Sequence, residues 1–262
     1  MHNDLSLDYA NAEFIDRAEE FPLLWDAKAT AFRTHLGDRF HGGIPYGDGA
    51  RQALDLCLPT GTPRGLVVFI HGGYWLMRER SIWTHLAAGA LARDWAVALP
   101  GYTLAPQARI HEITSDVEAS ITAAAKLVSG PIVVTGHSAG GHLAARMGCS
   151  DRTPEWLGRL VRVLPVSPIA DLEPIRHTAM QRDLRIDDAE VKTESPARHK
   201  RHADVECCVW VGGQERPTFL WHARTLSENW NCPWHVAPGR HHFDVIEDLE
   251  DPQSLLVQTL LG

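Results

Sequence analysis

The sequence predicts an α/β fold in which a mostly parallel central sheet is flanked by helices. Short runs of apolar and β-branched residues alternate along the chain with longer stretches of helical periodicity. Such alternation implies strands joined by right-handed helical crossovers. With 262 residues, 44% of them hydrophobic, the chain is long enough to bury a sizeable core. We therefore expect residues 1–262 to form one domain.

Composition excludes several classes of function. The formal net charge is −8 and no run of basic residues is present, which argues against nucleic acid as a partner. No apolar run approaches the ~20 residues that span a bilayer, and the first residues lack the basic segment and apolar core of a signal peptide. The five cysteines show no metal-type spacing. We expect a cytoplasmic protein without a membrane partner, a cofactor or a metal.

The chain opens with an expected helical arm at residues 1–36. Helical stretches at 13–20 and 25–35 are interrupted at Pro22, because proline disrupts a helix interior. Such an arm either caps a functional site or packs on the outside, and the sequence leaves both alternatives open.

The sheet elements follow in order. Antiparallel strands are expected within 39–58, where Leu54, Leu56 and Leu58 alternate with other residues. The continuous apolar run at 65–70 is typical of a central strand. Further strands are expected at 95–99, 131–135, 161–166, 205–212 and 232–237, and helices at 81–93, 113–128, 142–147, 217–230 and 251–261.

Residues 168–203 interrupt this alternation. The segment is polar, contains three prolines and is too long for a simple connection. We expect a helical excursion that lies near the mouth of the site and could form a cap.

A Gly-x-Ser-x-Gly motif, Gly136-His137-Ser138-Ala139-Gly140, stands between the strand at 131–135 and the helix that follows. In that context the motif predicts a nucleophile elbow, a sharp turn that raises a serine hydroxyl above the edge of the sheet. Gly136 and Gly140 provide the space that such a turn requires. The helix N-terminus then presents amides and a positive dipole end near Ser138.

A second glycine motif, His71-Gly72-Gly73-Tyr74-Trp75, comes directly after the strand at 65–70. Glycines at this place let main-chain N–H groups face a cavity, and acyl transfer needs such donors for the oxyanion of its tetrahedral intermediate. We expect the amides of Gly72, Gly73 and Ala139 to form an oxyanion hole. His71 is expected to brace the loop through hydrogen bonds.

A serine nucleophile needs a base and an acid that orients it. The base is expected on the loop after the last strand, which leaves His241 and His242. Glu215 follows the preceding strand at its carboxyl end and is the preferred acid. The alternatives that stay open for the acid are Asp187, Asp188 and Asp244.

With these pieces placed, the chain resembles the kynurenine formamidase (arylformamidase) branch of the α/β-hydrolases. The resemblance extends from about residue 40 to the C-terminus and is weaker in the arm. It implies an α/β-hydrolase fold, Ser138 as nucleophile, His242 rather than His241 as base and Glu215 as acid. The motifs that carry it are His71-Gly72-Gly73-Tyr74-Trp75, Tyr102-Thr103-Leu104-Ala105-Pro106, residues 136–143 and His242-Phe243-Asp244.

The chain departs from the pattern in three places. Related esterases tend to have an acidic residue where this chain has Gly101, the acid loop continues with Arg216-Pro217, and residues 168–203 carry no matching motif. These departures bear on the substrate more than on the type of reaction.

We expect a metal-independent serine hydrolase that removes a small acyl group, formyl above all, from an aryl amide such as N-formylkynurenine. Tyr74, Trp75 and Tyr102 are expected to flank an aromatic leaving group. The alternatives are a general short-chain carboxylesterase, a non-catalytic binding protein of the same fold and a metal-dependent amidase. Oligomeric state stays open between a monomer and a homodimer.

Overall fold

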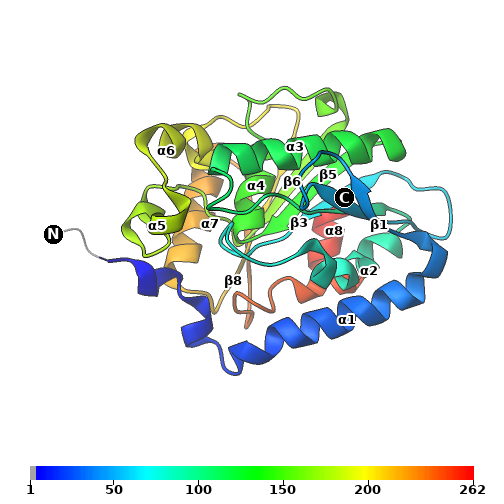
Figure 1. The fold of residues 1–262 in the computed structure, drawn as a ribbon, viewed down its shortest axis with the longest axis horizontal. Helices are drawn as coiled ribbons and strands as arrows, with labels where there is room; N and C mark the ends of the chain where they lie inside the picture. Colours follow the sequence, from blue (N-terminus) through cyan, green and yellow to red (C-terminus); the bar gives the residue numbers. More distant parts are fainter. Residues whose placement is uncertain (1–3) are drawn as a thin grey trace.

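The computed structural model describes residues 4–262, which form a nine-stranded mixed sheet flanked by helices (Figure 1). Along the sheet the strands stand in the order β1-β2-β4-β3-β5-β6-β8-β9, with β7 beside β6. The first two pairings are antiparallel, and the pairings from β4 onward are parallel. The strands are β1 (Phe40–Pro45), β2 (Ala53–Cys57), β3 (Leu66–Ile70), β4 (Ala96–Pro100), β5 (Ile132–His137), β6 (Leu160–Val166), β7 (Glu206–Cys207), β8 (Val209–Gly212) and β9 (Trp234–Ala237).

The helices divide between the two faces of this sheet. They are α1 (Phe21–Leu36), α2 (Ala88–Leu91), α3 (Ile110–Leu127), α4 (Ala139–Met147), α5 (Gln181–Leu184), α6 (Asp188–Glu194), α7 (Pro217–Trp230) and α8 (Leu255–Leu261). In β3, Leu66 and Val68 point to a core shared with α3, α4 and α7, whereas Val67 and Phe69 point to a core shared with α1, α2 and α8. Because successive strand side chains alternate between faces, one apolar strand supplies both cores.

The N-terminal arm differs from the expectation. Residues 4–20 contain three short 3-10 helices, η1 (Ser6–Tyr9), η2 (Asn11–Phe14) and η3 (Ala18–Glu20), and α1 follows as one uninterrupted helix. Pro22 lies in the first turn of α1, where its missing N–H would be unpaired in any case, so the proline begins the helix and does not break it. Residues 1–3 of the predicted arm lie outside the described part of the chain.

Two further expectations need correction. The helix expected at 81–93 is mostly a 3-10 helix, η5 (Arg80–Ala87), and only its last turn is the α-helix α2. The strand expected at 205–212 is divided into β7 and β8, which both lie beside β6. The other predicted strands, and α3, α4, α7 and α8, are confirmed with small shifts of their ends.

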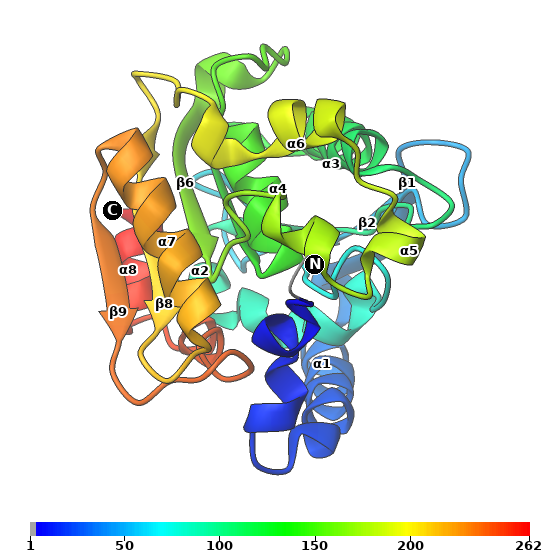
Figure 2. The same cartoon turned by 90° about the vertical axis from the view of Figure 1, so that its left-hand side faces the viewer.

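Residues 168–203 form the expected helical excursion. It contains η7 (Pro174–His177), α5, α6 and η8 (Pro196–Arg198). The N-terminal segment lies against it, because the amide of Leu5 donates to the carbonyl of His177 (2.8 Å) and the amide of Ala179 donates to Ser6 Oγ (2.8 Å). In Figure 2 the dark-blue segment that begins at residue 4 lies near α5. Across residues 4–262, every helix is too short or too polar to traverse a lipid bilayer.

Several histidines are buried inside the fold in the neutral form, among them His71, His142 and His222. Burial lowers the pKa of His71 to about 4 and the pKa values of His142 and His222 to about 3. The ring of His222 is fixed at both nitrogens, since Nδ1 accepts from the amide of Ala170 (3.2 Å) and Nε2 lies 2.8 Å from Tyr9 Oη. Protonation at Nδ1 would break the bond from Ala170.

Acid should therefore destabilise the fold before most carboxylates titrate. A histidine in the unfolded chain has a pKa of about 6.5, whereas these folded histidines have lower pKa values. Between the two values the unfolded chain binds more protons than the folded chain, so the free energy of unfolding falls as the pH falls. Each buried histidine contributes a slope of up to ~1.4 kcal/mol per pH unit. Urea unfolding of the wild type, measured by tryptophan fluorescence from pH 7.5 to 4.5, should show this decline.

His222→Gln should give a shallower decline, because the titrating ring is gone while a side-chain amide remains. His35→Gln, at an exposed position of α1, is the matched control and should follow the wild type. Parallel curves for wild type and His222→Gln would contradict the assignment of His222.

Candidate active site

Ser138 stands at the sharp turn between β5 and α4. Its backbone has φ 59° and ψ −119°, a conformation in the left-handed half of φ space that costs free energy for a residue with a side chain. The turn is closely packed, since a Cβ on Gly136 would lie 2.3 Å from the carbonyl oxygen of Gly140, and a Cβ on Gly140 would lie 2.0 Å from that of Ile70. Only glycine fits these two positions, as the motif predicts.

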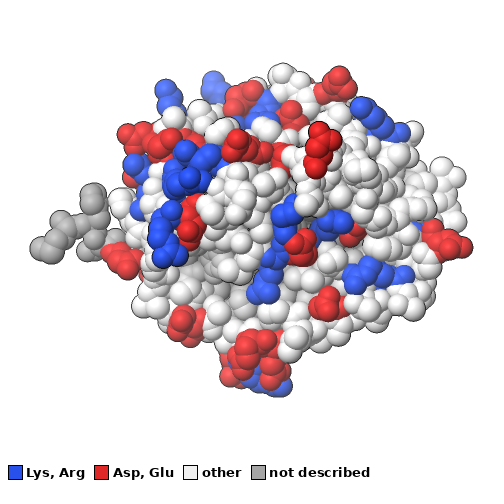
Figure 3. Space-filling model, viewed as in Figure 1, with Lys and Arg blue, Asp and Glu red and all other residues white. Residues whose placement is uncertain are grey.

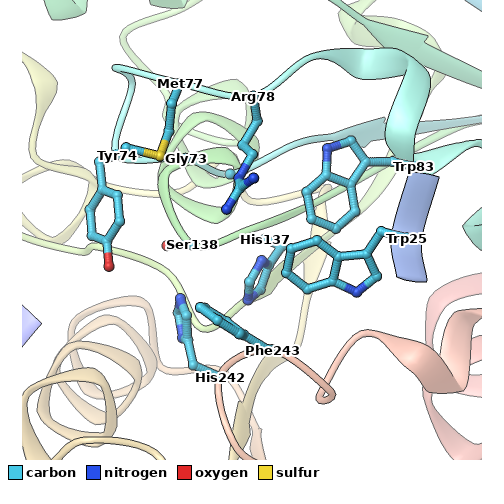
Figure 4. Close-up of a pocket in the computed structure, with 11 residues that line it drawn as sticks. Trp25, Gly73, Tyr74, Met77, Arg78, Trp83, His137, Ser138, His242 and Phe243 are labelled. Carbon is cyan, nitrogen blue, oxygen red and sulfur yellow. The ribbon is translucent and has the colours of Figure 1, made fainter. Parts of the chain in front are cut away.

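The Ser138 side chain lines a cavity of about 50 Å³ at the carboxyl ends of the parallel strands (Figure 4). Its walls come from α1, the loop after β3, η5, the end of β5 and the loop after β9. The lining residues are Trp25, Gly72, Gly73, Tyr74, Met77, Arg78, Trp83, His137, Ser138, His242 and Phe243.

His242 and Glu215 form a buried pair beside this cavity. His242 Nδ1 donates to Glu215 Oε2 over 2.6 Å, and the two residues are 4% and 7% exposed. The other carboxylate oxygen of Glu215 accepts from the amide of Gly212 (2.9 Å) and from the hydroxyl of Ser167. With Nδ1 engaged, Nε2 is the nitrogen left for the cavity, and Figure 4 shows the His242 ring directed toward Ser138. A base oriented in this way by a carboxylate can take a proton from a serine hydroxyl.

The other candidates for base and acid are engaged elsewhere. His241 Nδ1 accepts from the amides of Phe243 and Asp244 (3.1 and 3.2 Å), and Asp244 in turn accepts from the His241 amide (2.7 Å). Both residues therefore shape the loop that carries the base. Asp187 caps α6, and Asp188 is exposed at the surface. The structure brings Ser138, His242 and Glu215 together and does not bring these alternatives to the cavity.

The glycine loop after β3 lies against Ser138. A Cβ on Gly72 would lie 3.1 Å from Ser138 Cβ, and Gly73 has φ +121°, a value that favours glycine. Among residues 4–262, the amide N–H groups of Gly72, Gly73 and Ala139 donate to no backbone or side-chain acceptor. Ala139 is the first residue of α4, where N–H groups have no partner within the helix. Three unpaired donors close to a serine suit an oxyanion.

His71 braces this loop, as expected. Its Nδ1 donates to the carbonyl of Gly72 (2.7 Å), and the Tyr102 hydroxyl donates to the carbonyl of His71 (2.7 Å). The two rings are stacked with centroids 4.4 Å apart. Because burial keeps the ring of His71 neutral, it holds backbone in place without a charge.

Of the three aromatic residues expected at the leaving group, only Tyr74 lines the cavity. Trp75 and Tyr102 are 1% and 0% exposed and belong to the core on the α3 side of the sheet, so the expectation for these two is corrected. They were expected at the site because they follow strand ends, but the positive φ values of Tyr74 (58°) and Trp75 (61°) turn the chain so that the tryptophan points inward.

A different aromatic wall takes their place. The ring of Trp25 from α1 lies 4.6 Å from that of Trp83 in η5 and 5.5 Å from that of Phe243, measured between centroids. The N-terminal arm therefore contributes to the site as well as packing on the outside. Sequence reasoning missed this wall, together with Met77, Arg78 and His137, because its members lie far apart along the chain. Of these residues, Phe243 and His137 stood within motifs that the sequence analysis named, without being assigned to the cavity.

Within the described residues, no group of three or more His, Cys, Asp or Glu side chains is arranged to hold a metal ion. Among the residues that line the cavity, His137 and His242 are of a ligand type. Burial, and the neighbouring ring of His242 at 4.5 Å, hold the pKa of His137 well below its usual value.

Comparison with known proteins gives this chain relatives that are named as formamidases, esterases and a thioesterase candidate. The BD-FAE family model matches residues 54–225. Kynurenine formamidases from Salmo salar and Danio rerio are each 28% identical to this chain, over 83% of it and 80% of their own length. A thioesterase candidate from Silicibacter sp. TM1040 has a crystal structure with a TM-score of 0.97 and 46% identity over 99% of both chains.

A more distant structure shows the fold alone. An esterase from Pyrobaculum calidifontis superposes with a TM-score of 0.69 at 18% identity, over 92% of this chain and 89% of that one. These findings confirm the predicted α/β-hydrolase fold and the predicted resemblance to kynurenine formamidases.

The geometry predicts which histidine activates the serine. A fluorophosphonate probe should label Ser138 and no other serine, because among the serines of residues 4–262 only Ser138 lines the cavity with His242 and the glycine loop. His242→Asn should slow labelling roughly 10²- to 10⁴-fold, the usual contribution of a general base. Labelling rates are measured by intact-protein mass spectrometry.

His241→Asn is the matched control, since it makes the same change one residue away. It should label at close to the wild-type rate. Equal loss in the two variants would mean that the loop conformation, and not the His242 ring, governs the reactivity of the serine.

Proposed function

Because the chain belongs to the BD-FAE family and is an enzyme of the α/β-hydrolase type, we propose that it removes a formyl group from an aryl amide of the N-formylkynurenine type. The observation that carries the proposal is the convergence of Ser138 and the His242–Glu215 pair on a small cavity with an aromatic wall. The kynurenine formamidases that resemble the chain support the choice of substrate.

In the first half of the reaction Ser138 Oγ attacks the formyl carbon while His242 Nε2 takes the hydroxyl proton. The carbonyl oxygen becomes an oxyanion, which the amides of Gly72, Gly73 and Ala139 stabilise. Glu215 holds the imidazole in the tautomer that presents Nε2 and stabilises the imidazolium that forms. The intermediate then collapses, the C–N bond breaks, and His242 gives its proton to the departing aryl amine.

In the second half a water molecule takes the place of the amine. His242 removes a proton from this water, the water oxygen attacks the formyl-serine ester, and a second oxyanion forms at the same amides. Collapse returns the proton to Ser138 Oγ and releases formate. His242 relays every proton transfer and the backbone amides stabilise both oxyanions, so the proposed reaction requires no metal.

The size of the cavity favours a small acyl group. About 50 Å³ is well below the 300–1,000 Å³ of a site that encloses a drug-sized ligand. A formyl group fits beside Ser138, and the leaving group then lies toward the aromatic rings of Trp25, Trp83 and Phe243. A longer acyl chain would need Tyr74 or Met77 to move, since these residues separate the cavity from a larger apolar one of about 250 Å³.

The second candidate is a short-chain carboxylesterase or thioesterase. The Silicibacter relative is a thioesterase candidate at 46% identity, and several structural neighbours are named esterases. Ester and amide cleavage use the same nucleophile, base and oxyanion donors. The esterase and thioesterase names therefore differ from the proposal in the leaving group and not in the catalytic groups. A non-catalytic binding protein would have no need for the strained Ser138 and the buried His242–Glu215 pair.

A substrate panel should separate these candidates. We expect the largest kcat/KM on N-formylkynurenine, measured by release of the free aryl amine, with p-nitrophenyl acetate next and p-nitrophenyl butyrate and acetyl-CoA lower. The order follows from the small acyl space beside Ser138. High turnover of the butyrate ester or of the thioester with none on the formamide would refute the formamidase proposal and favour the esterase.

Removing the nucleophile should abolish turnover and leave the fold intact. Ser138→Ala should lower kcat by roughly 10⁴-fold or more, because base and acid have nothing to activate, while the thermal unfolding midpoint changes little. Ser115→Ala, at an exposed position of α3, is the control and should keep full activity. The activity of the wild type should survive dialysis against EDTA, and its loss there would indicate a metal-dependent reaction.

A further inference from the structure

Arg78 is a charged side chain at the edge of the candidate site that has no ion pair and no hydrogen-bond acceptor among residues 4–262. It lies on the loop between β3 and η5, is half-buried and lines the same cavity as Ser138. Its stem packs on the oxyanion loop, because a Cβ on Gly73 would lie 2.9 Å from Arg78 Cγ. Figure 4 shows the guanidinium hanging into the cavity on the side of Ser138 and His137. Its backbone is strained as well, with φ 80°.

The arginines around it are paired, which makes Arg78 the exception in its neighbourhood. Arg51 forms an ion pair with Glu79, and Arg80 lies 2.9 Å from Asp55. Figure 3 shows basic and acidic side chains interspersed over one face of the molecule. The side chain of Arg78 has no ion pair and no hydrogen bond within residues 4–262, and the described residues that line the cavity include no aspartate or glutamate.

An unpaired cation in such a place is costly. Burial lowers the pKa of Arg78, which means that the surroundings disfavour its charge. The ring of Trp25, 5.8 Å from the guanidinium carbon, offers a cation–π contact, and such a contact does not replace a hydrogen-bonded anion. Within the described part of the chain the five N–H donors of the guanidinium have no acceptor, and a carboxylate would satisfy two of them at once.

We propose that Arg78 binds a carboxylate on the leaving group of the substrate, so that the enzyme selects aryl amides that carry an acid. This inference rests on the proposed function and names the part of the substrate that the site distinguishes. The aromatic rings of Trp25, Trp83 and Phe243 lie on the same side of the cavity and receive the aryl ring.

Trp83 adds a second donor to this subsite. Its indole N–H is buried and has no acceptor among residues 4–262. Figure 4 draws that nitrogen on the side of the Trp83 ring that faces Arg78. A carboxylate between the two side chains would satisfy both, which accounts for two unpaired polar groups with one ligand.

The test compares N-formylkynurenine with its α-carboxamide, which has the same shape and no charge. Release of the aryl amine is followed for the wild type, Arg78→Gln and Arg78→Lys. A hydrogen bond to a charged group is worth about 1.5–3 kcal/mol, or roughly a 10- to 150-fold change. We expect the wild type to prefer the carboxylate by this factor, mainly through a lower KM, and to lose part of the preference at high salt.

Arg78→Gln should lose the preference, so that its kcat/KM falls more on the carboxylate than on the carboxamide, while Arg78→Lys should retain part of the preference. Arg182→Gln is the matched control, because it makes the same change of net charge at a side chain that is 86% exposed. The inference is overturned if the wild type treats both substrates alike, or if Arg78→Gln lowers kcat/KM equally on both.

A failure of the proposed function looks different. If the wild type cleaves no formamide but cleaves esters in a Ser138-dependent reaction, the formamidase proposal is wrong. The esters 4-acetoxybenzoate and 4-acetoxybenzamide then test in the same way whether Arg78 produces a preference for the carboxylate. A preference for the acetoxybenzoate that Arg78→Gln removes would sustain the carboxylate subsite, and its absence in the wild type would refute it.

Discussion

The close approach of three backbone segments around Gly140 is the constraint on which the site depends. The start of α4 comes so near to the end of β3 that any side chain at Gly140 would overlap the carbonyl of Ile70, and Gly136 is equally confined. This packing holds Ser138 at φ 59°. The glycine loop lies against the serine, because a Cβ on Gly72 would lie 3.1 Å from Ser138 Cβ. The strain at the serine persists because the strands β3 and β5 are paired in register up to Ile70 and Gly136.

A second anchor sets the position of His242, and it lies at the ends of β6 and β8, on the opposite flank of β5 from β3. Glu215 is held by the amide of Gly212 at the end of β8 and by the hydroxyl of Ser167 at the end of β6. Its remaining oxygen orients His242, which arrives on the loop after β9. Neighbouring parallel strands thus bring Ser138, Glu215 and His242 to one edge of the sheet, because the carboxyl ends of these strands coincide. Loops carry the reactive groups, and the sheet fixes the distances between them.

The sequence predicted the strands, helices and turns that depend on residues adjacent in the chain. The apolar runs predicted the parallel strands, and the helix expected at 217–230 has those bounds in α7. The glycine motifs predicted the neighbourhood of Ser138, since only glycine fits there. Pro22 was misread because proline both breaks a helix and begins one, and the 3.6-residue period did not reveal that η5 is a 3-10 helix. Trp25, Arg78 and Trp83 meet through long-range packing, which no local pattern encodes.

The family model covers one part of the site, and the rest of the site comes from segments before and after the matched region. The matched region, residues 54–225, contains Ser138, the glycine loop and Glu215, whereas Trp25 and Phe243 of the aromatic wall lie outside it. The proposed nucleophile, oxyanion loop and acid therefore lie in the region that the family model matches, whereas the proposed base, His242, follows it. The aromatic wall is divided as well, because Trp83 lies in the matched region, Trp25 before it and Phe243 after it. Segments outside the matched region therefore complete both the proposed catalytic group and the surface proposed for the leaving group.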